Sequence, residues 1–399
     1  MDHTLWAYPW DILDDPGAAD EIASLGLGRV SLAATYHTTR TLLPHNPRRK
    51  ILLARYAAAY FEPDPAAYAG LRLRPSIPDW VPPDSFGTAL AALRASGQAV
   101  NAWIVVLHNT RLGEANPDLV IENAFGDRYT HALCPAQAEV RAYASALIGD
   151  IARRYQVNAI ELEACGYMSV EHLSHHEKAG IQLDLLHRFL LSVCFCRACT
   201  TAMAADGLDP DETRAAVRVA SEAFLEGGMT PTNGPADVAA RLEAVLGEDP
   251  ANRLVQMRNR VTFDLHDQIA AELVTRAPGL NAPDMVISAG ASVYETGAAI
   301  GADPAGLAAR ADRLLMHLLT LPDDELEATT ERMVDAVAGQ ASVDIGVAAF
   351  APATPDADRL ARCVRRLAAA GAQGIHYYHY GLCPRQNLGW IAEAAGARA

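Results

Sequence analysis

Short apolar segments alternate with stretches of helical period along most of this 399-residue chain. Strands that are repeatedly followed by helices are typical of a parallel sheet, and eight such units are the number found in a TIM barrel. The eight expected strands are Leu5–Tyr8, Arg29–Ala34, Ala99–Leu107, Ala159–Glu163, Met285–Ala289, Arg313–Leu318, Val343–Ala349 and Gly374–Tyr378. The pattern therefore predicts an α/β chain folded as one TIM-barrel domain over residues 1–399.

One interval, between Glu163 and Met285, is too long for a single helix. It carries four stretches with helical period, namely Leu183–Met203, Asp211–Phe224, Pro235–Leu246 and Ala251–Ala277. We therefore expect a helical insertion after the fourth strand, over residues 168–250, followed by the helix that leads into the fifth. A doubly wound sheet is the alternative, but it would need a glycine-rich phosphate-binding turn after an early strand, and the sequence has none.

Charge and composition narrow the class of partner. The chain has 33 basic and 48 acidic residues, for a net charge of -15, and its one basic run, Arg48-Arg49-Lys50, is short. Nucleic-acid grooves need clustered cations, so we expect no nucleic-acid partner. Because no apolar run approaches the ~20 residues that cross a bilayer and the first residues lack a basic region, we expect a cytoplasmic protein without membrane association. The sequence leaves open whether it forms a homo-oligomer.

Polar and aromatic residues gather just after the expected strands, where TIM barrels carry their active sites. Aromatic rings stack on the apolar face of a sugar while polar groups bind its hydroxyls, so these residues predict a small carbohydrate or sugar-like substrate. The predicted substrate-binding residues are Asp11, Tyr36, His37, Arg40, His108, Asn109, Arg111, Tyr167, His176, Tyr378 and His379. Further aromatic candidates are Trp6, Trp10, Trp103 and Tyr377.

Two carboxylates, Glu161 and Glu163, end the fourth expected strand. Alternation along a strand turns both toward the inside of the barrel. Mutual repulsion and burial should raise the pKa of at least one of them, which is the condition for a general acid near neutral pH. The alternative is that one of the pair forms a structural ion pair with Arg40 or Arg111.

Seven cysteines include a tight cluster, Cys194-Phe-Cys196-Arg-Ala-Cys199. This spacing does not suit a disulfide framework, whereas zinc takes four thiolate ligands in a tetrahedron, and Cys134 is the natural fourth. Four cysteines leave no open position on the metal. We therefore predict a structural zinc that ties the insertion to the barrel, and no organic cofactor. The alternative is a set of ordinary buried thiols.

Several of these motifs together resemble the zinc-binding β-galactosidases of glycoside hydrolase family 42 and related glycosidase-like barrels. The matching motifs, between residues 127 and 204, are Leu133-Cys134-Pro135, Val140-Arg141-Ala-Tyr143, the strand ending in Glu163, and Cys194-x-Cys196-x-x-Cys199. The resemblance implies a zinc bound by the four cysteines and Glu163 as the acid/base.

The seventh strand departs from that family. The family places its nucleophilic Glu after this strand, whereas here Gly346-Val-Ala-Ala-Phe350-Ala-Pro contains no carboxylate. Candidates for a second catalytic carboxylate are therefore Glu161, Glu295 and Asp11. A Glu-x-Glu pair could also serve inversion or substrate assistance.

Together these features predict a glycosidase-type hydrolase that acts on a small glycoside or oligosaccharide with Glu163 as general acid/base. A second interpretation is a barrel lyase or isomerase in which Glu161 and Glu163 transfer protons while Arg40 and Arg111 clamp an anion. A third is a non-catalytic sugar-binding barrel.

Overall fold

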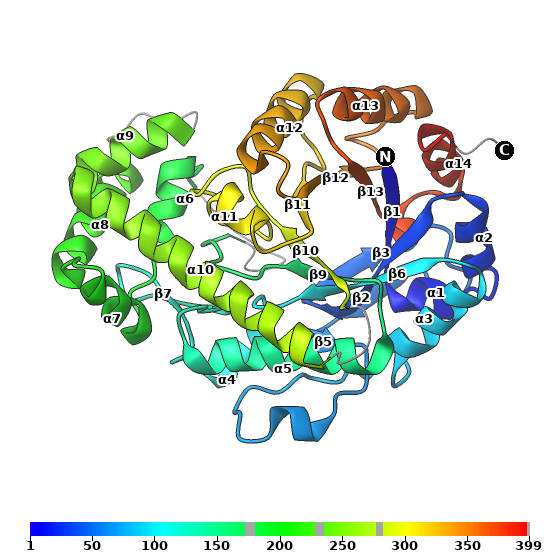
Figure 1. The fold of residues 1–399 in the computed structure, drawn as a ribbon, viewed down its shortest axis with the longest axis horizontal. Coiled ribbons are helices and arrows are strands. Elements are labelled where there is room, and N and C mark those ends of the chain that lie inside the picture. The colour runs from blue at the N-terminus through cyan, green and yellow to red at the C-terminus, as the bar shows by residue number, and fades with distance from the viewer. Residues whose placement is uncertain (172–179, 228–234, 277–281, 397–399) are drawn as a thin grey trace.

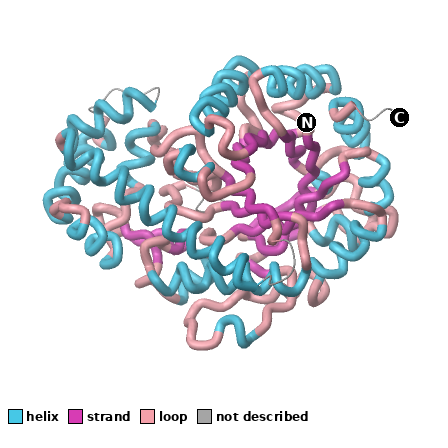
Figure 2. Tube along the Cα trace, viewed as in Figure 1, coloured by secondary structure: helices cyan, strands magenta, loops and turns pink. Residues whose placement is uncertain are grey.

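A computed structural model describes residues 1–171, 180–227, 235–276 and 282–396. Eight parallel strands close into a barrel ringed by helices (Figures 1 and 2). In chain order they are β1 (Asp2–Ala7), β2 (Gly28–Tyr36), β6 (Ala99–Val105), β9 (Ala159–Glu163), β10 (Asp284–Ser288), β11 (Arg313–His317), β12 (Ser342–Ala348) and β13 (Gly374–Tyr378). Each strand pairs with the next, and β1 closes the barrel by pairing with both β2 and β13. The predicted TIM barrel is confirmed, and each predicted strand overlaps an observed one.

The helices present one apolar face to the strands. In α13, four buried residues follow the spacing of a helical stripe: Leu360, Cys363, Val364 and Leu367. The barrel is surrounded in chain order by α2 (Ala18–Ser24), α3 (Ser85–Ala95), α5 (Ala138–Tyr155), α10 (Glu248–Arg276), α11 (Pro304–Ala308), α12 (Asp323–Val337), α13 (Ala357–Ala369) and α14 (Arg385–Ala394). No helix in the described part of the chain is both long and apolar enough to span a membrane.

A helical lobe follows β9, as predicted, and projects from one side of the barrel (Figure 1, green). It contains α6 (Leu185–Leu191), α7 (Arg197–Ala205), α8 (Pro210–Leu225) and α9 (Pro235–Leu246). The prediction of one continuous helix over Leu183–Met203 is wrong, because the chain breaks between α6 and α7. In a helix, residues two apart point to different sides, so the break is what lets the sulfurs of Cys194 and Cys196 meet.

Two further insertions follow β2 and β6, and the sequence pattern did not reveal them. After β2 come the hairpin β3 (Thr39–Leu42) and β4 (Ile51–Ala54), the short strand β5 (Ala58–Ala59) and the 3₁₀ helix η1 (Pro65–Tyr68). After β6 come α4 (Thr110–Ala115) and the hairpin β7 (Val120–Glu122) and β8 (Arg128–Leu133). The short α1 (Pro9–Leu13) and η2 (Tyr380–Leu382) follow β1 and β13.

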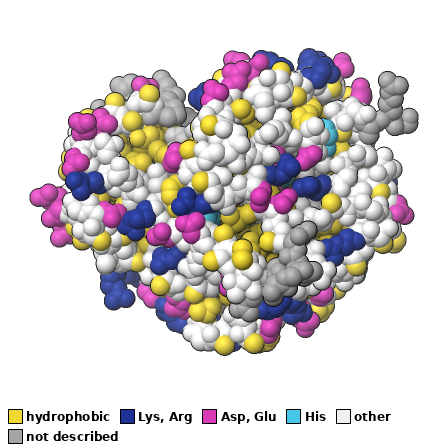
Figure 3. Space-filling model, viewed as in Figure 1, with side chains coloured by type: hydrophobic (Ala, Val, Ile, Leu, Met, Phe, Trp, Pro, Cys, Tyr) yellow, Lys and Arg dark blue, Asp and Glu magenta, His cyan; other side chains and the backbone are white. Residues whose placement is uncertain are grey.

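Charged side chains of both signs are interspersed on the face shown in Figure 3. This face therefore shows no continuous basic surface of the kind that nucleic acids need.

Candidate active site

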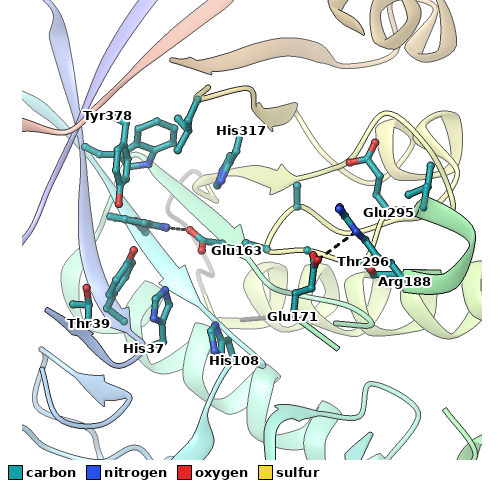
Figure 4. Close-up of a pocket in the computed structure, with 18 residues that line it drawn as sticks. His37, Thr39, His108, Glu163, Glu171, Arg188, Glu295, Thr296, His317 and Tyr378 are labelled. Carbon is teal, nitrogen blue, oxygen red and sulfur yellow. Dashed lines mark hydrogen bonds and ion pairs between the residues drawn. The ribbon is translucent and has the colours of Figure 1, made fainter. Parts of the chain in front are cut away.

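A cavity of about 550 Å³ opens at the carboxyl ends of the barrel strands. This volume lies within the usual range for small-molecule sites, roughly 300–1,000 Å³. Its walls include side chains from the strand ends, from the loops after β2, β6 and β10, and from the segment after β9 (Figure 4). The polar and aromatic lining residues are Trp6, Tyr36, His37, Thr39, Trp103, His108, Glu163, Glu171, Arg188, Glu295, Thr296, His317 and Tyr378.

Glu163 lies at the inner wall of this cavity and is only 5% exposed. The indole nitrogen of Trp103 donates a hydrogen bond of 2.7 Å to its Oε2 (Figure 4). Burial raises the pKa of Glu163 from 4.5 to about 7, the charge of Glu161 adds to this rise, and the bond from Trp103 opposes it. Glu163 therefore holds its proton to a higher pH than an ordinary glutamate does.

Glu161 also points inward, but it lies deeper than the cavity and is fully buried. Trp6 donates a 2.6 Å hydrogen bond to its Oε1, and Ser31 donates to its Oε2. Burial raises the pKa of Glu161, although His376, Ser31 and Trp6 oppose the rise. Because Glu161 does not line the cavity, the geometry does not place it against a substrate.

Further ionisable side chains follow Glu161 inside the barrel. His376 Nδ1 lies 3.7 Å from Glu161, and its Nε2 lies 3.2 Å from Asp344. Arg313 contacts Asp344 at 3.1 Å. Burial alone would raise the pKa of Asp344, but His376 and Arg313 together lower it. Among the described residues no ion pair joins Arg40 or Arg111 to either glutamate, and both arginines are exposed. The basic side chain that contacts Glu161 is instead His376 of β13.

The seventh strand supplies no carboxylate to the cavity, because its one acidic residue, Asp344, is buried against His376 and Arg313 and is not among the lining residues. Two residues further along, a Cβ on Gly346 would come within 2.6 Å of the Trp6 ring. The indole of Trp6 therefore fills the space that an inward side chain at this position of β12 would occupy.

Aromatic rings form the wall around Glu163. Tyr36 packs edge-on against Trp103 with ring centres 4.8 Å apart, and Tyr378 packs in the same way against Trp6 at 5.7 Å. Tyr8 stacks behind them on Trp103 at 5.8 Å. Burial raises the pKa of the hydroxyls of Tyr36 and Tyr378, which therefore stay protonated and can donate to a ligand. The predicted residues Tyr36 and Tyr378 both line the cavity.

Three histidines also line the cavity. His37 and His108 were predicted, and they stack on each other with ring centres 4.5 Å apart. His317, the last residue of β11, was not predicted. Its Nε2 lies 3.0 Å from the Ser288 hydroxyl. Burial, with repulsion from His376, lowers the pKa of His317 to about 4.

Glu295, a predicted catalytic candidate, lines the cavity on the side away from Glu163, close to Arg188 (Figure 4). Its Oε1 accepts a 3.0 Å hydrogen bond from the backbone N–H of Ala291, in its own loop. Burial raises the pKa of Glu295. On the same side Glu171 and Arg188 form an ion pair of 3.3 Å.

Asp11 and His379 were predicted to bind substrate, but both are buried behind Tyr8 and do not line the cavity. Asp11 Oδ2 accepts a 2.8 Å bond from the Tyr8 backbone, and burial raises the pKa of Asp11 to about 8. The His379 ring packs on Tyr8 at 4.2 Å, and burial lowers its pKa to about 3. Neither residue is brought together with Glu163.

Other predicted residues lie elsewhere. Arg40 and Arg111 are exposed, and the guanidinium of Arg111 lies 4.1 Å from the centre of the Tyr56 ring. The structure therefore does not assemble the expected arginine clamp around the cavity. Asn109 instead caps α4 by accepting a 3.0 Å bond from the Leu112 N–H, and Tyr167 joins the cysteine cluster. His176 lies outside the described residues.

The four predicted cysteines converge in one buried cluster. The sulfur of Cys134 lies 3.5 Å from that of Cys199 and 3.7 Å from those of Cys194 and Cys196. A tetrahedral metal with sulfur bonds of about 2.3 Å holds its sulfurs about 3.8 Å apart, so the cluster is already close to this geometry. Within the described ranges it is the only group of three or more such ligands placed to hold a metal ion.

The surroundings of the cluster suit thiolates. Backbone N–H groups of Glu122 and Cys196 point at the Cys194 sulfur, each at 3.5 Å, and the Tyr167 hydroxyl lies 3.4 Å from the Cys199 sulfur. The buried cation of Arg258 lies 4.3 Å from the centre of the Tyr167 ring. Burial lowers the pKa of Arg258, while Tyr167 and the cysteines counteract this. A metal with four thiolates is an anion, and Arg258 would offset its charge.

No protein-family model and no curated protein matches the sequence. Solved structures do match. α-L-Fucosidase isoenzyme 2 from Paenibacillus thiaminolyticus is 15% identical, with a TM-score of 0.57 over 99% of this chain and 49% of its own. The catalytic domain of β-amylase from Paenibacillus polymyxa is 12% identical, with a TM-score of 0.56 over 100% of this chain and 99% of its own.

A GH42 β-galactosidase from G. stearothermophilus is 11% identical, with a TM-score of 0.56 over 99% of this chain and 56% of its own. This chain thus spans about half the length of the fucosidase and of the galactosidase. At these identities the likeness concerns the fold, and the resemblance expected from the sequence holds at that level. The chain therefore shares the TIM-barrel fold of glycoside hydrolases, among them a GH42 β-galactosidase.

Proposed function

We propose that this protein is a glycosidase-type hydrolase that acts on a small glycoside or oligosaccharide, with Glu163 as the general acid. The observation that carries the proposal is the position of Glu163 in a cavity at the carboxyl ends of the strands, with its pKa raised to about 7. A carboxyl group that keeps its proton near neutral pH can protonate the oxygen of a departing sugar or aglycone.

The aromatic wall supports a carbohydrate as the ligand. Trp6, Tyr36, Trp103 and Tyr378 line the same cavity as the Glu163 carboxyl. Such rings can stack on the C–H face of a pyranose, while His37, His108 and the tyrosine hydroxyls offer hydrogen bonds to its hydroxyl groups. The fold shared with glycoside hydrolases agrees with this assignment.

We also propose zinc as the metal of the cysteine cluster. Four thiolates at tetrahedral spacing match the structural zinc sites of proteins, and they leave no coordination position for a substrate. Zinc in this site would hold Cys134 and the loop between α6 and α7 together. It would take no part in the chemistry at Glu163.

The test is a screen of the full chain against aryl glycosides of several sugars, followed by Glu163→Gln on the best substrate. General acid catalysis typically contributes ~10²–10⁴-fold, so we expect kcat to fall by about that factor. A dinitrophenyl glycoside should lose much less, because its leaving group departs without a proton. Full turnover by Glu163→Gln on every glycoside would remove Glu163 from this role.

A non-catalytic sugar-binding barrel is the second candidate, favoured by the glycine at position 346 of β12, where an inward side chain has no room. Calorimetric titration with the sugars of the screen separates the two. Binding without any turnover would support the second candidate and exclude the hydrolase.

A further inference from the structure

The described carboxylates of the cavity leave Glu163 without an obvious partner to activate water. Glu171 is paired with Arg188. Glu295 accepts a hydrogen bond from its own loop, on the side of the cavity away from Glu163. Inverting hydrolysis requires a base that removes a proton from the attacking water, and a retaining enzyme requires a nucleophile. Neither carboxylate is turned toward Glu163 for either task.

A histidine occupies the wall beside Glu163 instead. His317 ends β11, and Figure 4 shows its ring pointing into the same space as the Glu163 carboxyl. Ser288, on the neighbouring strand β10, lies 3.0 Å from Nε2 and holds that side of the ring. A serine hydroxyl can donate or accept, so this contact suits either tautomer of His317. In the tautomer that carries its proton on Nε2, the ring donates to Ser288 and Nδ1 is the acceptor available to a water.

We propose that His317 is the general base of an inverting hydrolysis in which Glu163 is the general acid, with Ser288 as its positioning residue. The inference rests on the proposed glycosidase function and adds the base and the stereochemical outcome to it. Deprotonation of the attacking water by a neutral imidazole takes the place of the second carboxylate that glycosidases ordinarily use.

The step balances without any further reactant. Water attacks the anomeric carbon and forms the new C–O bond while the bond to the leaving oxygen breaks. The leaving oxygen takes the proton of Glu163, and the attacking water gives a proton to Nδ1 of His317. The products are a sugar of inverted configuration and the free aglycone, with a Glu163 carboxylate and a His317 imidazolium. Exchange with solvent then restores both protonation states.

The spacing of the strands agrees with inversion. Only β10 separates β9 from β11, and the register puts Glu163 level with Ser288 and Leu315, two residues before His317. Two strand spacings and two residues of rise place the backbones of Glu163 and His317 roughly 12 Å apart. Acid and base in inverting enzymes are ~6.5–9.5 Å apart, which leaves room for a water, whereas retaining enzymes need only ~5–5.5 Å. Two side chains that reach inward from such a backbone distance can flank a sugar and a water.

The surroundings of His317 and Glu163 shift the pKa values of these two side chains in opposite directions. His376 lies beneath His317 and is the one charged neighbour that affects its pKa. The other titratable groups that line the same cavity are Tyr36, His37, His108, Glu163, Glu171, Arg188, Glu295 and Tyr378. Burial first, and repulsion from His376 second, keep the pKa of His317 near 4, whereas the pKa of Glu163 is about 7. Between these values His317 is a neutral base while Glu163 is a protonated acid.

The first experiment is proton NMR of the sugar released from the best substrate of the screen by the full chain. We expect the first anomer formed to have the configuration opposite to that of the substrate. We also expect a bell-shaped pH profile of kcat/KM with limbs near 4 and 7. Release of the retained anomer by an active enzyme would overturn the inference but leave the proposed function standing.

The second experiment compares His317→Gln with Glu163→Gln. His317→Gln should lower kcat by ~10²–10⁴-fold on ordinary and dinitrophenyl glycosides alike, because water must be activated whatever the leaving group. It should also remove the acidic limb of the pH profile. Equal turnover of His317→Gln and the wild type, or an unchanged acidic limb, would overturn the inference.

The matched control is His3→Gln, a histidine in β1 that stacks on Tyr377 with ring centres 5.8 Å apart, at the opposite end of the barrel from the cavity. It should leave kcat and both limbs unchanged. If the wild type hydrolyses no glycoside, the proposed function and this inference fall together.

Discussion

Glu161 and Glu163 are two positions apart in β9 and point the same way, yet their surroundings differ. Glu161 accepts bonds from Trp6 and Ser31 and has His376 at 3.7 Å. Glu163 accepts one bond, from Trp103, and no positive charge is among the causes that set its pKa. Burial with few compensating partners favours the protonated acid at Glu163, and access to the cavity makes that proton usable.

The raised pKa of Glu163 also predicts how stability depends on pH. Because folding moves this pKa from 4.5 to about 7, Glu163 contributes its full stability below about 4.5, and that contribution is lost as pH rises through 7. The shift is worth about 3 kcal/mol. Glutamine does not titrate, so the Glu163→Gln variant does not lose this stability. As the pH rises from 4 to 8, its free energy of unfolding should therefore increase by about 3 kcal/mol relative to that of the wild type. Urea unfolding at both pH values measures it, and a constant difference would contradict the raised pKa.

The sequence was sufficient to predict that the Glu163 side chain faces the barrel interior, because successive side chains of a strand point to opposite faces of the sheet. The same rule could have found His317, a polar residue in inward register with Leu315 at the end of an apolar strand. It could not place Arg40 or Arg111. Arg40 lies in the hairpin strand β3 and Arg111 in the short helix α4. Both elements are insertions after barrel strands, so the alternation along a barrel strand does not set the direction of either side chain.

At the scale of elements, the sequence predicted the barrel strands well. Each barrel strand is buried on both faces and therefore appears in the sequence as a short apolar run. The hairpins after β2 and β6 were missed because β3, β4 and β7 are only three or four residues long and pair with strands outside the barrel. The interior of the barrel depends on contacts that no local pattern contains. The Trp6 indole, for example, needs a residue without a side chain on β12, which comes six barrel strands later in the chain but lies close in space.

Gly346→Ala tests this fit between β1 and β12. The added methyl would lie 2.6 Å from the Trp6 ring and would displace it from Glu161, so we expect a loss of about 1–3 kcal/mol in the free energy of unfolding. Thermal unfolding and tryptophan fluorescence measure the two effects. The matched control is Gly389→Ala in α14, where a Cβ meets nothing within 4 Å and alanine should be neutral or stabilising. Equal stability of both variants would show that the Trp6 ring is not confined at Gly346.

At the scale of the whole molecule, the cysteine cluster joins two insertions that are separate in the sequence. Cys134 follows β8, in the insertion after β6, while the other three cysteines lie in the helical lobe after β9. Each insertion also contributes to the cavity, through His108 in the first case and through Leu185 and Arg188 in the second. A metal in the cluster would therefore fix the relative position of two walls of the site, although it lies outside the cavity.

Cys196→Ser should therefore reduce metal content, stability and substrate binding together. The wild type should hold about one zinc per chain. Since zinc binding supplies folding free energy, a loss of several kcal/mol should lower the unfolding temperature by on the order of 10 °C. KM should rise more than kcat falls, because the cavity walls move while Glu163 stays on its strand. Cys363→Ser, a buried cysteine of α13 outside the cluster, is the control for replacing a thiol by a hydroxyl and should keep its zinc. Full zinc content in Cys196→Ser would exclude the four-cysteine site.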